Sequence, residues 1–266
     1  MAKYNLPHEE IKRFEVYNGR NTEQMPKLIA DGRVPMNVSQ IMERRWNLRN
    51  DKTGVKDFYM DNYFETGDAV VYHPETMETL IDLDSDILRG IHPNPKRLNG
   101  GAWLLSEDRD EAFAIYEQLK NQSNVVAFKK GKLGKINEQM SRKNVKAHPV
   151  WKTLARDQAQ LDDYVDYIFA EGKQRFNYDT AMSVFSSSAQ GNTPEMRVWY
   201  VYGLEARSGV DGEEYLDFDF GCLPGIAPEV PNALGKGASF DKIIKGLEGT
   251  LHPDVLKALA QLRKKL

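Results

Sequence analysis

Hydrophobic residues recur along the whole chain in short segments separated by turn residues, without an internal repeat, a low-complexity tract or a long linker. This distribution predicts a single compact domain over residues 1–266, with a possible helical N-terminal portion over 1–56. The termini show no separate tail.

Two helices are expected in that N-terminal portion. Thr22 can cap a short helix that ends at Asp31, and Asn37 with Gln40 three residues later resembles a capping box that begins a helix through Leu48. The apolar residues of the second helix share one face, so its arginines are expected nearer to solvent. These arginines are Arg44, Arg45 and Arg49.

A β-rich stretch follows. Residues 69–72 and 79–84 read as two strands joined by a turn over 73–76, which predicts a hairpin. Further strands are expected over 102–105, 124–128 and 196–205, with a partner strand over 213–220 in which Leu216, Phe218 and Phe220 point to one face.

Helical spacing returns between and after these strands. Ser106 is the expected cap of a helix through Lys120, and a long helix is expected from Pro149 to about Glu171. A last helix is expected to begin at His252 and to dock on the body. Hairpins outnumber strand-helix-strand units, so we predict an α+β fold with a mixed, largely antiparallel, hairpin-rich sheet packed with N-terminal, central and C-terminal helices.

Composition narrows the class of protein. The single cysteine, Cys222, excludes an intramolecular disulfide and a multi-cysteine metal cluster. The apolar runs are strand-sized, and the first twenty residues are polar rather than signal-like. We therefore expect a soluble, intracellular protein, placed in the cytoplasm, with no membrane association.

Charge is segregated along the chain although the net charge is only −3. Residues 129–146 contain seven basic residues and one acidic residue, with Gly131 and Gly134 among them. Such a segment can neutralise phosphates while its glycines let backbone amides approach them. We predict that it binds nucleic acid or another phosphate-bearing ligand through Lys129, Lys130, Lys132, Lys135, Arg142 and Lys143. The alternative is a solvated loop balanced by the acidic helix that follows.

Carboxylates on the predicted strands are a second lead. If the strand continues through Asp86, then Asp82, Asp84 and Asp86 share one face, and Asp217 with Asp219 alternate in the same way. Oxygen ligands at this spacing suit a hard divalent cation such as Mg2+. The candidate metal ligands are Asp82, Asp84, Asp217 and Asp219. An ordinary solvated strand face has the same pattern.

Histidine chemistry has weak support. Four of the five histidines precede a proline, which favours an extended strand end or a helix start. No nucleophile elbow or phosphate-binding P-loop motif occurs. Among the histidines, His73 at a strand end is the first to test.

Three hypotheses of function follow, and the sequence does not decide whether the protein is an enzyme. The leading one is binding of a phosphate-bearing ligand or nucleic acid by the basic segment. The second is a non-enzymatic interaction or structural protein whose segregated charges pair with each other, with a protein partner or in self-association. The third is a metal-dependent hydrolase built on the strand carboxylates.

Overall fold

The computed structural model describes residues 12–227. The chain divides into two units, Met1–Ala227 and Pro228–Leu266, and all described elements lie in the first. The helix expected after His252 lies outside the described residues, and a single domain over 1–266 stays a prediction.

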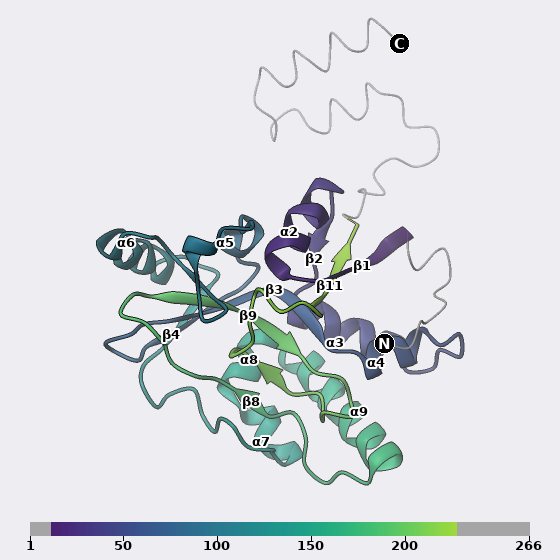
Figure 1. Ribbon diagram of the computed structural model, residues 1–266. Helices are drawn as coiled ribbons and strands as arrows, with labels where there is room; N and C mark the ends of the chain where they lie inside the picture. Colours follow the sequence, from purple (N-terminus) through teal and green to yellow (C-terminus); the bar gives the residue numbers. More distant parts are fainter. Residues whose placement is uncertain (1–11, 228–266) are drawn as a thin grey trace, which may run out of the picture. The chain divides into compact units, whose positions relative to one another are not determined.

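A large, mainly antiparallel sheet runs through the centre of this unit (Figure 1). Its strands lie in the order β5 (Leu98–Asn99), β6 (Ala102–Leu104), β9 (Glu195–Val201), β3 (Phe64–Tyr72), β4 (Thr79–Asp82) and β7 (Val125–Phe128). At the side of β9, β10 (Val210–Asp211) pairs antiparallel with that strand and parallel with β8 (Val184–Phe185). All nine residues of β3 are buried, because helices cover both faces of the sheet.

A smaller sheet joins the two ends of the described chain. It contains β1 (Phe14–Asn18), β11 (Cys222–Ile226) and β2 (Val34–Pro35), with β11 in the middle and all pairs antiparallel. Phe14 lies opposite Ile226, and Asn18 lies opposite Cys222. This pairing closes the unit between segments about two hundred residues apart.

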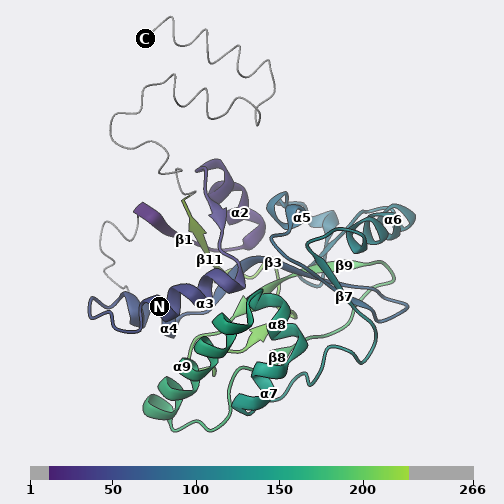
Figure 2. The ribbon, with the colours of Figure 1, turned by 180° about the vertical axis from the view of Figure 1, so that it is seen from behind.

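Successive side chains of β3 point to opposite faces of the large sheet, and each face has its own hydrophobic cluster. Val70 and Tyr72 belong to one cluster, and Ala69 and Val71 belong to the other. The first face is covered by α3 (Val38–Asn47), α4 (Val55–Asp61), α7 (Arg142–Ala147), α8 (Pro149–Ala155) and α9 (Gln158–Phe176). The second is covered by α2 (Asn21–Ala30), α5 (Asp86–Arg89) and α6 (Arg109–Lys120), as both views show (Figure 2). A 3-10 turn, η1 (Pro95–Arg97), precedes β5.

The predicted α+β class and the hairpin of β3 and β4 are confirmed. The capping box of α3 is confirmed too. The Asn37 side chain accepts from the Gln40 backbone N–H at 2.9 Å, and the Gln40 side chain accepts from the Asn37 N–H at 3.0 Å. Among residues 12–227, every helix is too short or too polar to span a bilayer.

Two predicted helix starts were wrong by a few residues. Thr22 lies inside α2, which follows Arg20 without a side-chain cap. Helix α6 begins after Asp108, whose carboxylate accepts from the Glu111 N–H at 2.9 Å, while the Ser106 hydroxyl accepts from the Asp108 N–H. An aspartate nearer the first turn satisfies the free N–H groups directly, so it takes the capping role.

The single long helix expected from Pro149 is two helices. Arg156 has a φ of 62°, which ends α8, and Asp157 begins α9 by accepting from the Gln160 N–H at 2.7 Å. The same apolar spacing continues through the break, which is why periodicity alone did not reveal it.

The strand expected over 213–220 is absent from the described fold. Buried Arg197 on β9 explains this, because its guanidinium donates to the carbonyls of Glu213 and Glu214 at 2.7 and 3.1 Å. Those carbonyls are thereby withdrawn from strand pairing. Leu216 is buried whereas Phe218 and Phe220 are exposed, so the predicted alternation was wrong.

Arg45 was expected nearer to solvent and is fully buried. Its guanidinium donates to the carbonyls of Tyr59, Asn62 and Tyr202 at 2.8 to 3.1 Å. It also donates to the Tyr164 hydroxyl at 2.9 Å. Carbonyls left over at the ends of other elements therefore solvate the charge in place of water.

Candidate functional site

The basic segment leaves β7 as a loop and ends in α7. Gly131 and Gly134 have φ values of 72° and 88°, which favour glycine. A Cβ on Gly134 would lie 2.7 Å from His148 Nε2, so this position has no space for a side chain. His148 Nε2 lies 2.9 Å from the Lys135 carbonyl, and burial lowers the pKa of this histidine. A neutral ring that donates from Nε2 therefore fastens the loop to the start of α8.

The cations of the segment fall into two groups. Arg142 and Lys146 lie 3.6 and 2.9 Å from Asp166 of α9, and Lys135 lies 3.0 Å from Glu138. The two pairs with Asp166 are the balance with the acidic helix that the alternative interpretation predicted. Among residues 12–227, no ion pair is formed by four further lysines of the segment, which are Lys129, Lys130, Lys132 and Lys143.

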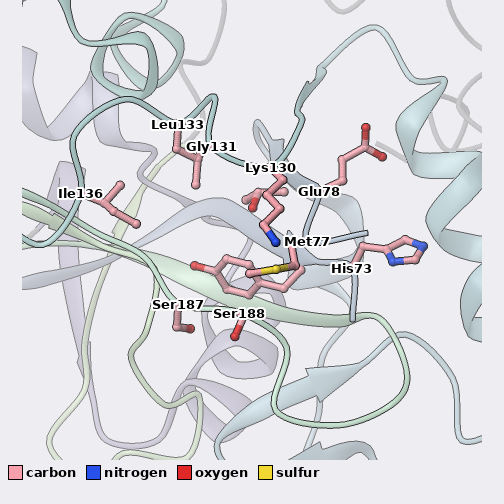
Figure 3. Close-up of a pocket in the computed structure, with 11 residues that line it drawn as sticks. His73, Met77, Glu78, Lys130, Gly131, Leu133, Ile136, Ser187 and Ser188 are labelled. Carbon is pink, nitrogen blue, oxygen red and sulfur yellow. The ribbon is translucent and has the colours of Figure 1, made fainter. Parts of the chain in front are cut away.

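One hollow lies where the loop passes β3 and the segment before β9. It has a volume of about 100 Å3, and Lys130, Gly131, Ser187 and Ser188 are among its lining residues. The amine of Lys130 extends into the hollow toward Met77 (Figure 3). This volume is well below the range of about 300 to 1,000 Å3 usual for small-molecule sites. Lys130 and Glu78 are its charged lining residues, and the Glu78 carboxylate is paired with Lys120 of α6 at 2.6 Å.

His73 does not serve this hollow as a free base. Its Nδ1 accepts from the backbone N–H groups of Glu75 and Thr76, both at 3.1 Å. Its ring packs edge-on against Phe113 and Tyr116 of α6 and points away from Lys130 (Figure 3). The geometry gives His73 a structural role in the turn between β3 and β4.

A second hollow lies between α7 and the C-terminal half of α9, and we call it the α7–α9 hollow. Its volume is about 410 Å3, within the range of ligand sites. Seven residues line it: Ser141, Arg142, Lys143, Phe169, Lys173, Tyr178 and Asp179. Three of them are cations and one is an acid, so its lining carries excess positive charge.

The ion pair of Lys173 in this hollow is exposed to solvent and therefore weak. Lys173 lies 3.0 Å from Asp179, and the side chains of the two residues are 54 and 83% exposed. Exposed pairs of this kind are worth about 0 to 1 kcal/mol, so an anionic ligand can compete for the lysine at small cost. The Arg142 guanidinium lies over the Phe169 ring, 5.6 Å from its centroid, which places an apolar surface beside the charge.

The structure therefore divides the predicted ligand-binding residues. Arg142 and Lys143 meet in the α7–α9 hollow, whereas Lys130 lines the smaller one. Lys129, Lys132 and Lys135 line neither. Sequence analysis missed Lys173 and Tyr178. The lysine could have been found, because it lies seven residues after Asp166 and four after Phe169, which puts all three on one face of α9.

The four carboxylates predicted as metal ligands do not form one site. Strand β4 ends at Asp82, and Asp84 has a φ of 53°, so the two do not share a strand face. Asp84 faces Arg156 at 3.1 Å, and Asp219 lies 2.6 Å from Arg20. Asp217 and Asp219 belong to a loop. Across residues 12–227, no three His, Cys, Asp or Glu side chains group closely enough to hold a metal ion.

Comparisons with known proteins give a fold but no family. No protein-family model matches the chain, and neither does any curated protein. A solved structure described as "Accommodation of massive sequence variation in Nanoarchaeota by the C-type lectin fold" matches 82% of this chain and 100% of its own, with a TM-score of 0.57 and 15% sequence identity. The chain therefore has an α+β, C-type lectin-like fold.

Proposed function

We propose that this protein is a non-enzymatic binding protein and that the α7–α9 hollow takes a phosphate-bearing ligand. The observation that carries the proposal is the convergence of Arg142, Lys143 and Lys173 around one hollow of ligand size with a single lining acid. Arginine and lysine side chains bind phosphate through charge-assisted hydrogen bonds. Ser141 adds a hydroxyl at the same edge.

The C-type lectin-like fold supports a binding role in a general way. The similar structure is described by the capacity of its fold to accommodate sequence variation. This property suits a scaffold in which the surface residues determine ligand specificity. Fold alone does not fix function, so the charge of the hollow carries the choice of ligand here.

Nucleic acid is the phosphate-bearing ligand that fits the wider surface best. Lys129, Lys130 and Lys132 continue the positive charge along the loop from β7 without internal ion pairs in the described chain, so they can meet phosphates beyond the hollow. Lys132 and its neighbours then add affinity only for a ligand long enough to reach them.

Fluorescence anisotropy with a labelled single strand and a labelled duplex tests the proposal, with inorganic phosphate as competitor. The variant Arg142→Gln, Lys143→Gln, Lys173→Gln is expected to weaken binding at least about tenfold at low salt, because each lost charge-assisted hydrogen bond to phosphate reduces the binding free energy. The matched control neutralises three exposed lysines elsewhere, Lys27, Lys52 and Lys96, and is expected to retain the affinity.

Salt dependence gives a second readout. If three cations contact phosphates of a duplex, the log of the association constant falls with the log of salt with a slope of roughly −3. Equal losses of affinity in the hollow variant and in the control would indicate binding to the overall positive charge of the protein and not to a specific site. Absence of binding at low salt would refute the proposal and would leave the ion pairs of Arg142 with Asp166 and of Lys173 with Asp179 as the role of these cations.

A further inference from the structure

A third hollow lies on the opposite face of the large sheet, between α5, α6 and the turn η1. Its volume is about 380 Å3. The apolar part of its lining consists of Ile87, Leu105, Ile115 and Leu119, and the polar part of Asp82, Asp86, Arg97, Gln118 and Gln122. The helices on this face belong to a different hydrophobic cluster from that of the α7–α9 hollow, so the two sites are separate.

Asp82 is the unusual member of this lining. It ends β4 with 1% of its surface exposed, and Oδ1 accepts from the Asn124 amide at 3.0 Å. Oδ2 is buried without a hydrogen-bond partner among the described residues, although the nearby Ser85 hydroxyl lowers the pKa somewhat. Burial raises the pKa of this carboxyl to about 6 overall. A buried carboxylate oxygen that lacks a well-placed donor is costly, so a cationic group that reaches it gains a favourable contact.

The charges around the hollow favour a cation as the missing partner. Asp86 at the start of α5 adds a second carboxylate, although Arg89 lies 3.2 Å from it. Arg97 is the cation of the lining, and its guanidinium is directed to protein groups. It donates to the carbonyls of Leu104 and Leu105, both at 2.7 Å, and lies 4.8 Å from the Trp103 ring centroid.

We propose that this hollow binds a small ligand consisting of a primary ammonium group on a short apolar body, with the ammonium on Asp82 and the apolar body against Ile115 and Leu119. Asp86 and the amides of Gln118 and Gln122 are the further acceptors for the three N–H groups of the ammonium. Because Oδ2 is covered in this structure, the ammonium reaches it only if the Asp82 carboxyl turns toward the hollow.

Two sources can supply this chemistry, a simple alkylamine or an amino acid with a branched apolar side chain. Isothermal titration calorimetry with the full chain separates them by using 3-methylbutylamine, leucine and 3-methylbutanoate as probes. The amine is expected to bind and the acid is not. If leucine binds more tightly than the amine, its carboxylate adds to the affinity, and an amino acid is the ligand class.

Variants of two positions make the test specific. Asp82→Asn is expected to weaken amine binding about 10- to 100-fold, the usual effect of losing a hydrogen bond to a charged group. Since it removes a buried charge, its melting temperature is expected to be at or above that of the wild type, so loss of binding is not loss of folding. Glu117→Gln, an exposed acid on α6 outside the lining, is the matched control and is expected to bind normally.

Gln118→Trp tests the cavity itself. Gln118 is exposed, so the larger ring can occupy the hollow without disturbing the core, and it is expected to abolish amine binding. Unchanged amine binding by Asp82→Asn would overturn the proposal, and so would failure of all amines to bind. A melting temperature raised by Mg2+ but not by the amine would replace it with a metal site. None of these results depends on phosphate binding at the α7–α9 hollow.

Discussion

Glu65 is a fully buried carboxyl on β3. Burial raises the pKa of its side chain to about 8, although the Tyr200 hydroxyl donates to Oε1 at 2.6 Å and partly opposes the shift. The side chain of Asn21 lies close to the same carboxyl and opposes the shift as well. At neutral pH the folded protein therefore holds Glu65 mainly in its protonated form, which the unfolded chain does not.

This difference predicts a pH dependence of stability. The folded state binds one more proton than the unfolded state between the ordinary pKa of about 4.5 and the raised pKa of about 8. The contribution of Glu65 is therefore fully present below about pH 4.5 and is lost as the pH rises through about 8, at up to about 1.4 kcal/mol per pH unit. Urea unfolding at pH 5, 7 and 9 measures it.

Glu65→Gln is expected to remove this slope and to be more stable than the wild type at pH 9. Gln keeps an oxygen for the Tyr200 hydroxyl and carries no charge. Glu43→Gln, at an exposed position, serves as the control and is expected to follow the wild type. If Glu65→Gln and Glu43→Gln show the same pH profile, Glu65 is ionised in the folded state.

At the scale of elements, the break between α8 and α9 positions the candidate site. The left-handed conformation of Arg156 ends one helix, and Asp157 begins the next. Because α9 restarts here, its later turns bring Phe169 and Lys173 beside α7. In an uninterrupted helix, Phe169 and Lys173 would lie along a different helix axis and not beside α7.

The sign of the change in the free energy of unfolding caused by one substitution distinguishes two separate helices from one uninterrupted helix. Asp157→Ala removes a helix cap and is expected to lower the free energy of unfolding by about 1 kcal/mol. Within an uninterrupted helix the same change would stabilise, since alanine has the higher helix propensity. Asp163→Ala, at an exposed position inside α9, provides that comparison and is expected to be neutral or stabilising. Chemical denaturation of the three proteins decides the matter.

At the scale of the whole unit, Asp68 connects four segments that are distant in sequence. From the middle of β3 its carboxylate accepts from the backbone N–H groups of Val38 and Asp84, both at 2.9 Å. The guanidinium of Arg156 donates to it at 2.7 Å. Burial raises the pKa of this carboxyl, whereas Arg156 and the two N–H donors favour its charged form. The start of α3, the end of β4 and the junction of α8 and α9 thus share one buried anion.

Removal of this anion is expected to destabilise the whole unit. Asp68→Ala leaves two buried backbone donors without their acceptor and leaves Arg156 with Asp84 as its remaining carboxylate partner. We therefore expect a loss of about 3 to 5 kcal/mol in the free energy of unfolding. Glu75→Ala removes the partner of Arg109 in an exposed ion pair and is expected to cost less than about 1 kcal/mol. Losses of similar size in the two variants would refute the role of Asp68.

Local features of this chain were predictable because their causes lie within a few residues. The capping box of Asn37 and Gln40, the hairpin of β3 and β4 and the α+β class each depend on neighbouring side chains or on short-range alternation. The basic segment was equally visible, and its residues Arg142 and Lys143 line the proposed site.

The tertiary structure decided the features that depend on distant partners. Arg45 is buried because three carbonyls from two other segments, the end of α4 and the residue after β9, solvate it, and no spacing within α3 encodes that. The strand expected over 213–220 does not form, because the buried Arg197 guanidinium takes the carbonyls of Glu213 and Glu214 as its acceptors. Likewise the α7–α9 hollow exists because packing brings Lys173 to Arg142. A sequence determines periodicity and capping through local contacts, whereas the pairing of buried polar groups is settled by which segments meet.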